Sequence, residues 1–328
     1  MARSTSADVA RASGVSRTTV SYVLNGRADA SISAATRERV HEAARRLGYA
    51  PSAAARSLRT GRSDLVLCVL PDWPIGPVVD ALLEHLTEEL ADRGMALLVH
   101  HGRDRRPLAE LWRAVDVRAV VGLAPFAAAD EAAMRRAGID VLTTAAGAEG
   151  GPGPTAGAQE RTGRLQVRHL AAAGHRTVGY AATTDPRVSA FAEQRLAGAR
   201  AACVDLGLPA PSVREVDLEA PAAAAAVRAW RAEDPPVTAV AAYNDDVALA
   251  VLAGARAEGL EVPGDVAVVG VDDVPAARLA APPLTTVAQS VDAQVAHLVA
   301  RLVAHLDGDG PDGPAPPELL EVVVRSST

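Results

Sequence analysis

The stretch ADVARASGVSRTTVSYVLNG, residues 7–26, contains two short amphipathic segments separated by a glycine, and it decides how the beginning of the chain folds. Thr5 and Ser16 precede these segments and are residue types that cap helix N-termini. Gly14 between them can take the left-handed backbone conformation that ends a helix. The pattern therefore predicts a helix-turn-helix candidate with helices over residues 6–13 and 17–24.

A third helix is expected directly after this pair. Ser33 can cap it, residues 34–47 carry apolar side chains at helical spacing, and Gly48 can end it. The apolar faces of the first and third helices can then cover the apolar side of the second helix. The side chains expected in this small core are Val9, Val15, Val20, Val23, Leu24, Val40, Ala44 and Leu47.

The other side of the second helix is polar and needs a partner. At about 100° per residue, five polar side chains gather in an arc of about 140°. They are Arg17, Thr18, Ser21, Tyr22 and Asn25. Arg17 and Thr18 stand at the N-terminal end of the arc, where recognition helices approach the edges of base pairs. The arc favours DNA binding, and the alternative is a solvated helix on an ordinary helical bundle.

The charge of the chain is unevenly distributed, which supports the same interpretation. Residues 1–62 hold 11 Arg and 4 acidic residues, whereas residues 63–328 hold 22 Arg and 36 acidic residues. The head is therefore basic and the body acidic. A small basic unit on an acidic chain is typical of nucleic-acid binding, because cations placed near phosphates release condensed counterions.

The length of 328 residues exceeds what one hydrophobic core normally serves, and it predicts two or three compact units. No apolar run approaches the roughly 18 to 20 residues of a membrane span, and the opening MARSTSADV lacks the pattern of a signal peptide. We therefore expect a cytoplasmic protein, which the predicted DNA binding would associate with the nucleoid. Cys68 and Cys203 stand far apart in apolar surroundings, so we expect two buried thiols rather than a disulfide or a metal site.

The rest of the chain alternates short apolar strands with helical segments, which is the order of βαβ units and predicts parallel sheets. A first set of strands comprises residues 65–71, 95–101, 119–124 and 140–146. A second set comprises residues 176–181, 236–243 and 266–271, with helices around 195–206 and 246–254. The Gly- and Pro-rich segment 147–158 indicates a crossing between two lobes. Open parallel sheets bind ligands beyond the carboxyl ends of their strands, so a ligand is expected between the lobes.

Residues 7–26, together with TRERVHEAARRLGYAPSAAARSLRTGRS (36–63), resemble the headpiece and hinge of the lac repressor family. Weaker resemblance extends through HLAAAGHRTVGY (169–180), AEQRLAGARAA (192–202), YNDDVALAVL (243–252), GLEVPGDVAVVGVDD (259–273) and PPLTTV (282–287). The resemblance implies an all-α helix-turn-helix headpiece with a hinge helix, followed by an α/β two-lobed periplasmic-binding-protein-like domain with two doubly wound parallel sheets. It also implies a homodimer that binds a near-palindromic operator in double-stranded DNA and switches when a small-molecule effector enters between the lobes.

The expected domains are a headpiece over residues 1–49, a hinge helix over 50–62 and an effector-binding and dimerisation domain over 63–328. Within this last domain we expect an N-lobe of about 63–157 and 288–308, and a C-lobe of about 158–287 and 312–328. Leu58 matches the family's hinge leucine, which implies a wedge between base pairs in the minor groove. The expected DNA-binding residues are Thr5, Ser16, Arg17, Thr18, Thr19, Ser21, Tyr22, Asn25, Arg56 and Leu58.

Six residues are expected to bind the effector. Asp72 and Trp73 follow the first strand of the N-lobe, Phe126 follows the third, and Asn244 and Asp272 follow strands of the C-lobe. The resemblance implies polar effector contacts at Asn244 and Asp272 and adds Arg195. Carboxylates accept hydroxyl hydrogens, guanidinium groups donate and an aromatic ring can stack on a sugar face, so the expected effector is sugar-like or otherwise hydroxylated. The alternative for a carboxylate is a loop or helix cap, and for Arg195 a solvated helix residue.

The chain departs from the family pattern where the C-lobe begins. Many members carry Asp-Asn there, whereas this chain has Ala158 and Gln159, which removes a polar contact often made to sugars. Other protein classes have little support: the sequence contains no GxSxG, P-loop or HExxH motif, so we expect no enzyme, cofactor or metal. A solute-uptake protein would need an export signal. A constitutive architectural protein is the alternative among DNA-binding proteins.

Overall fold

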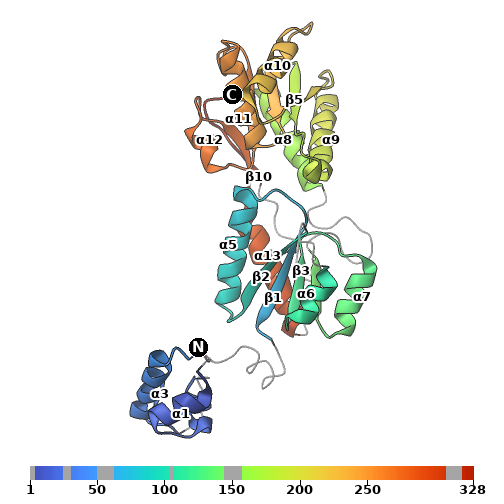
Figure 1. Cartoon of the computed structure of the whole chain (residues 1–328). Coiled ribbons are helices and arrows are strands. Elements are labelled where there is room, and N and C mark those ends of the chain that lie inside the picture. Colours follow the sequence, from blue (N-terminus) through green and yellow to red (C-terminus); the bar gives the residue numbers. More distant parts are fainter. Residues whose placement is uncertain (1–3, 25–30, 50–62, 103–106, 144–156, 308–319) are drawn as a thin grey trace. The chain divides into compact units, whose positions relative to one another are not determined.

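The computed structural model describes residues 4–24, 31–49, 63–102, 107–143, 157–307 and 320–328 of the chain (Figure 1). Asn25 and the hinge 50–62, with Arg56 and Leu58, lie outside the described residues, so their expected roles stay predictions. Among the helices that are described, none combines the length and hydropathy of a membrane span. Cys68 and Cys203 are free and buried, which confirms the expectation for both thiols.

The described part of the headpiece folds as the sequence predicts. Its helices are α1 (Ser6–Ser13), α2 (Arg17–Leu24) and α3 (Ala34–Arg46). Both caps are confirmed, because Thr5 Oγ1 accepts a hydrogen bond from the Asp8 N–H at 3.4 Å and Ser16 Oγ accepts one from the Thr19 N–H at 3.0 Å. Gly14 ends α1 in the left-handed conformation. The helices enclose a core of Val9, Ala10, Val20, Val23, Val40, Ala43 and Ala44.

The N-lobe sheet has four parallel strands in the order β2-β1-β3-β4. These are β1 (Leu65–Leu70), β2 (Ala96–His101), β3 (Ala119–Gly122) and β4 (Asp140–Thr143). The helices of this lobe are α5 (Pro77–Ala91), α6 (Leu108–Ala114), α7 (Ala128–Arg136) and α13 (Val291–Asp307). Leucines of α5 and α13 share one core with β1 and β3, so the chain returns to this sheet after leaving it.

The C-lobe sheet has six strands in the order β10-β9-β8-β7-β5-β6. These are β5 (Val178–Ala182), β6 (Ser212–Glu215), β7 (Ala239–Ala242), β8 (Ala267–Val271), β9 (Thr285–Gln289) and β10 (Leu320–Val323). Its helices are α8 (Ala158–Ala172), α9 (Ser189–Asp205), α10 (Ala220–Arg231), α11 (Asp245–Ala257) and α12 (Pro275–Leu279), with a 3-10 turn at Pro186–Val188. One core contains residues of α10 and α11, including Trp230, and another contains residues of α8 and α9, so both faces of the sheet are covered.

This sheet differs from the expected purely parallel one. β10 pairs antiparallel with β9, because the end of the chain runs back along that strand. Two of the three strands that the sequence analysis missed, β6 and β10, are four-residue strands at the edges of the sheet, where the apolar pattern is weak. The third, β9, begins with two buried threonines and extends to Gln289, so the expected lobe boundary at residue 288 falls inside it.

Helices α8 and α9 lie in close contact through two glycines. A Cβ atom on Gly163 of α8 would be 1.9 Å from the carbonyl oxygen of Arg195, and one on Gly198 of α9 would be 1.9 Å from that of Glu160. Since any side chain at either position would collide with backbone, glycine is what allows the two helices to approach. The contact places the first turn of α8 beside the middle of α9.

Candidate functional site

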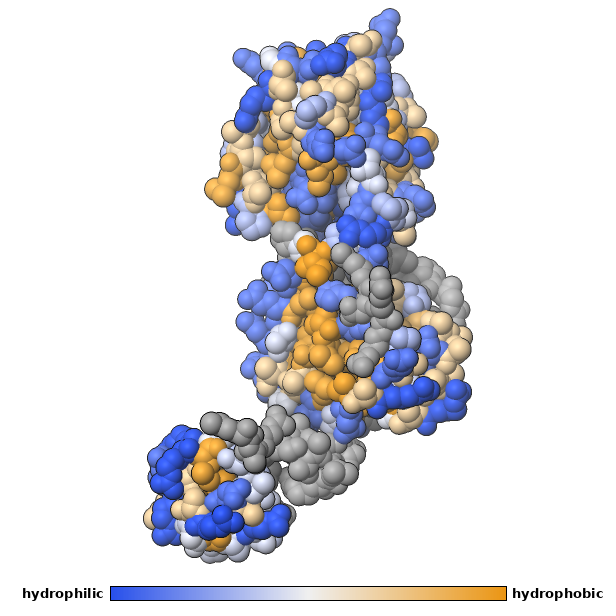
Figure 2. Space-filling view, in the orientation of Figure 1, coloured by the Kyte–Doolittle hydropathy of each residue, from blue (hydrophilic) through white to orange (hydrophobic). Residues whose placement is uncertain are grey.

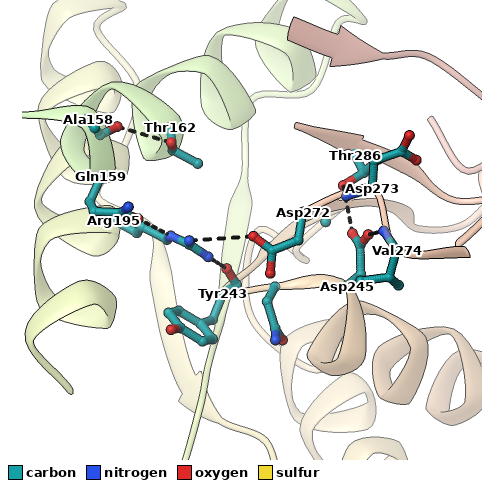
Figure 3. Close-up of polar contacts among 12 residues, drawn as sticks. Ala158, Gln159, Thr162, Arg195, Tyr243, Asp245, Asp272, Asp273, Val274 and Thr286 are labelled. Carbon is teal, nitrogen blue, oxygen red and sulfur yellow. Dashed lines mark hydrogen bonds and ion pairs between the residues drawn. The ribbon is translucent and has the colours of Figure 1, made fainter. Parts of the chain in front are cut away.

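A group of polar side chains gathers where α8 and α9 meet the carboxyl ends of β7 and β8 (Figure 3). We call Gln159, Arg195, Tyr243 and Asp272 the C-lobe cluster. Arg195 extends from α9 into the middle of it and is only 6% exposed, so the sequence alternative of a solvated helix residue is wrong. Its Nε donates to Gln159 Oε1 at 2.5 Å, and its Nη1 donates to the carbonyl oxygen of Tyr243 at 2.6 Å.

Asp272 faces the same guanidinium group. Its Oδ1 lies 3.6 Å from Arg195 Nη2, which is an ion pair but too long for a hydrogen bond. Burial raises the pKa of Asp272, and the positive charge of Arg195 opposes that rise. The residue has a φ of 107°, a conformation that L-residues seldom adopt, and its N–H donates to the carbonyl oxygen of Val287 at 2.9 Å. The turn after β8 is therefore held in a specific shape that presents the carboxylate to Arg195.

Tyr243 contributes both its backbone and its ring. The Arg195 guanidinium carbon lies 4.8 Å from the centre of the Tyr243 ring, within the range of a cation–π interaction. Burial raises the pKa of the Tyr243 hydroxyl to about 12, so the group is neutral at physiological pH. Arg195 is thus held by three uncharged groups, a side-chain amide, a backbone carbonyl and an aromatic ring, and it faces one charged group, the Asp272 carboxylate.

Two neighbouring residues have capping or structural roles. Asn244 accepts a hydrogen bond from the Val247 N–H through Oδ1 at 3.0 Å and thereby caps α11. Asp245 is fully buried, and its carboxylate accepts hydrogen bonds from Thr286 Oγ1 at 2.6 Å and from the Val274 N–H at 2.9 Å (Figure 3). Burial raises the pKa of Asp245 to about 7. Asp245 therefore fastens the turn that carries Asp272 from behind.

The three N-lobe residues predicted for the effector are not part of the C-lobe cluster. Asp72 is exposed. The Trp73 ring packs edge-on against Phe191 of α9, with 5.1 Å between ring centres, so its neighbour here is another aromatic side chain. The half-buried ring of Phe126 lies over Gly122, where a Cβ atom would approach it to 2.6 Å. Their roles as effector ligands stay predictions.

Four of the five residues of the predicted polar arc lie within the described part of the headpiece. Arg17 and Thr18 are exposed at the beginning of α2, whereas Ser21 and Tyr22 are half-buried. Thr5 and Ser16 are occupied as helix caps, and Thr19 Oγ1 lies 2.9 Å from Ser16 Oγ. Of the predicted DNA-binding residues that the structure describes, Arg17 and Thr18 are therefore the most available to a partner.

Sequence reasoning missed two glutamines. Gln159 entered the analysis only as a departure from a pattern, yet it binds Arg195 directly. Gln166 is fully buried on the inner side of α8, and its amide nitrogen donates toward carbonyl oxygens of β7 and β8. A polar residue on the apolar face of a helix was the available signal. Within the described residues, no cluster of His, Cys, Asp and Glu has the makings of a metal site.

Known protein families match both the headpiece and the body of the chain. Residues 5–52 match the family described as bacterial regulatory proteins, lacI family, and residues 167–328 match the periplasmic binding protein-like domain. The HTH-type transcriptional regulator CelR of Thermobifida fusca is 30% identical, over 92% of this chain and 91% of its own length.

Two solved structures extend the similarity to the fold. A complex of the transcriptional regulator CelR with cellobiose covers 99% of this chain and 100% of its own, with a TM-score of 0.64 and 28% identity. The lac repressor bound to ONPG in the repressed state covers 100% of both chains, with a TM-score of 0.78 and 25% identity. Both the headpiece and the two-sheet body thus have counterparts in single, similarly organised chains.

Proposed function

Because the chain belongs to the lacI family of bacterial regulatory proteins, we propose that it is a transcriptional repressor whose affinity for an operator changes when a hydroxylated small molecule binds between its lobes. The observation that carries the proposal is the ion pair between the buried Arg195 and the half-buried Asp272, which follows a strand of the parallel sheet. A regulator needs such a ligand site in addition to a DNA-reading headpiece. An architectural DNA-binding protein does not need one.

The pair suits a neutral ligand with hydroxyl groups. A guanidinium group has five N–H donors, and Gln159 and Tyr243 accept hydrogen bonds from only two of its nitrogens. A hydroxyl group can accept from Arg195 and donate to Asp272 at the same time. An anion would meet the carboxylate, and a cation would meet the guanidinium group. A sugar fits this requirement, and the solved CelR relative holds cellobiose.

The proposal is tested by operator release. Operator fragments selected with the purified chain are titrated with and without a panel of mono- and disaccharides that includes cellobiose. We expect one sugar class to change operator affinity. Arg195→Ala and Asp272→Asn should each lower the affinity for that sugar by about ten- to a hundredfold. This corresponds to the loss of one charge-assisted hydrogen bond, roughly 1.5 to 3 kcal/mol. Operator affinity without sugar should stay near that of the parent.

Arg200→Ala is the matched control, because Arg200 is exposed on the same helix as Arg195. Its sugar response should equal that of the parent. Retained response in both cluster variants would place the effector elsewhere. Operator affinity that no small molecule changes would favour the architectural alternative.

We assign recognition of the operator's base sequence to Arg17, which is exposed at the start of α2. An arginine there can bind a guanine through both O6 and N7, which is worth about 1 to 3 kcal/mol of discrimination. Arg17→Ala is expected to relax base preference at one position in each half-site, measured by selection from a randomised operator library. Arg11→Ala, on the neighbouring helix, serves as the control, and an unchanged preference for Arg17→Ala would contradict the assignment.

The proposed repressor acts as a homodimer, because one headpiece reads one half of a near-palindrome. The N-lobe supports this with an apolar edge: Figure 2 shows apolar side chains gathered over β2 and the adjoining flank of α5. β2 is an edge strand of its sheet, and an uncovered apolar edge is a place where another chain can pair. The half-exposed residues there are Val79, Leu82, Leu83, Leu97, Leu98 and Val99.

The relatives are transcriptional regulators rather than enzymes, and we propose the same for this chain. An operator is reached inside the bacterial cell. The proposed function therefore locates the protein in the cytoplasm, in association with the nucleoid.

A further inference from the structure

We propose that two glutamines of α8, Gln159 and Gln166, are positioning residues for the effector site: Gln159 sets the orientation of the Arg195 guanidinium group, and Gln166 holds the strand ends that carry Tyr243 and Asp272. The two residues are seven positions apart, so they share one face of the helix. This inference rests on the proposed function of the C-lobe cluster as the effector site.

Gln159 acts on the rotation of the guanidinium group. A guanidinium group is planar, so fixing its Nε–H and one Nη also fixes the direction of the other Nη. Gln159 Oε1 accepts from Nε at 2.5 Å, and the Tyr243 carbonyl accepts from Nη1 at 2.6 Å. Nη2 is thereby directed toward Asp272 (Figure 3). Because the amide is neutral, it orients Arg195 without cancelling the charge that the ligand meets.

Gln166 acts on the strands behind the cluster. The ladder between β7 and β8 ends at the pair Ala241 and Val269, beyond which the two strands separate. The Gln166 amide nitrogen fills this opening, since it lies 2.8 Å from the carbonyl oxygen of Ala242, 3.3 Å from that of Val269 and 3.2 Å from that of Gly270. Tyr243 directly follows β7, and Asp272 directly follows β8. The amide therefore spaces the two chain segments that face Arg195.

The burial of Gln166 costs stability, which argues for a role other than packing. Its Oε1 has no hydrogen-bond partner among the described residues, and an unpaired buried acceptor is unfavourable. An apolar side chain would avoid the unpaired acceptor, but it would leave the carbonyl oxygens of the two strands without this donor. The amide nitrogen, and not the oxygen, faces the strands, because three carbonyl oxygens lie around it and would repel an oxygen there. A buried, partly satisfied amide beneath a polar cluster is typical of a functional constraint.

The α8–α9 contact makes both glutamines effective. Gly163 lies between them in sequence, and because it has no side chain α8 contacts the backbone of α9 at Arg195. A helix held this closely cannot shift to let either amide lose its partner without separating from α9. The close packing of the two helices therefore fixes where α8 places Gln159 and Gln166.

The first test requires no effector. In the full chain with isotope-labelled arginine, exchange of the Arg195 Nε–H with water is followed by NMR, and the signal is assigned by its loss in Arg195→Lys. Gln159→Leu is expected to speed this exchange by at least about tenfold, because the Nε–H loses its acceptor. Gln159→Glu restores an acceptor and should restore protection. Gln194→Leu, an exposed glutamine beside Arg195, should leave the exchange unchanged.

The second test concerns Gln166. In Gln166→Leu, amide exchange measured by mass spectrometry is expected to rise by about tenfold in peptides containing Tyr243 and Asp272. Peptides of the headpiece should not change. Unchanged exchange in either glutamine variant, or no rescue by Gln159→Glu, would overturn the proposed role of that residue. Since neither readout uses a sugar, a failure of the effector proposal shows instead as an operator affinity that no sugar changes.

Discussion

Replacing Gly198 by serine is expected to lower the free energy of unfolding by about 3 kcal/mol or more, the upper range of overpacking effects. A Cβ atom at this position would be 1.9 Å from the carbonyl oxygen of Glu160, which belongs to the backbone of α8 and cannot rotate away. The two helices would have to separate. The core that they share with the sheet, including Val167 and Ala202, would then open.

The direction of the stability change distinguishes the two possible effects of this substitution, a collision between the helices, which destabilises, and a higher helix propensity, which stabilises. In an exposed helix, replacing glycine by another residue normally stabilises by roughly 0.5 to 1 kcal/mol. Ala197→Ser, at the exposed neighbouring position, is the matched control and should change stability by about 0.5 kcal/mol. Urea unfolding followed by circular dichroism measures both variants. A Gly198→Ser chain as stable as the control would mean that α8 and α9 are not packed as closely as described.

The free energy of unfolding of the parent is expected to depend on pH by up to about 4 kcal/mol through Asp245, and Asp245→Asn is expected to remove this dependence. Each unit by which folding raises the pKa contributes about 1.4 kcal/mol. Burial raises the pKa of Asp245 from an ordinary value of 3.8 to about 7. The folded chain then binds this proton more tightly than the unfolded chain does. The contribution to stability is full below pH 3.8 and is lost as the pH rises through about 7.

When the pH rises from 5 to 8, the free energy of unfolding of the parent should therefore fall by about 2 to 3 kcal/mol relative to that of Asp245→Asn, at about 1.4 kcal/mol for each pH unit up to the raised pKa. The asparagine can keep both contacts, since its oxygen can accept from the Val274 N–H and its amide can donate to Thr286 Oγ1. Asp246→Asn is the control, because Asp246 is exposed beside Asp245. Urea unfolding across this pH range measures all three chains. Parallel pH profiles for the parent and Asp245→Asn would show that Asp245 does not hold a proton in this way.

Part of the candidate site could be predicted from the sequence, because some of its residues directly follow apolar strands. Asp272 was predicted because it directly follows an apolar strand, and Arg195 was assigned by family resemblance. The structure brings these two residues together. Asp72, Trp73 and Phe126 follow strands of the N-lobe sheet and lie outside this cluster, although Trp73 packs against Phe191 of α9. Residues at the ends of strands are recognisable in sequence, but their neighbours across the fold are not.

Local order along the chain determined the headpiece and the alternation of strands and helices. A cap such as Ser16, a left-handed glycine such as Gly14 and an apolar strand such as residues 65–70 act through neighbours within a few positions, so the sequence contains their full cause. Edge strands lack that cause. β6 and β10 form because a neighbouring strand offers hydrogen bonds, and nothing in their own four residues requires them.

Only the tertiary structure decided which polar residues became part of the site. Gln159 and Gln166 carry an ordinary amide in the sequence, and Asp245 is one acidic residue beside another. Each acquires its role from partners that lie 36, 76 and 41 positions away along the chain. The reason is physical: the hydrogen bonds and desolvation that orient an amide or raise a pKa depend on what packs around the group, and that packing is set by the order of strands in the sheet and by how closely two helices meet.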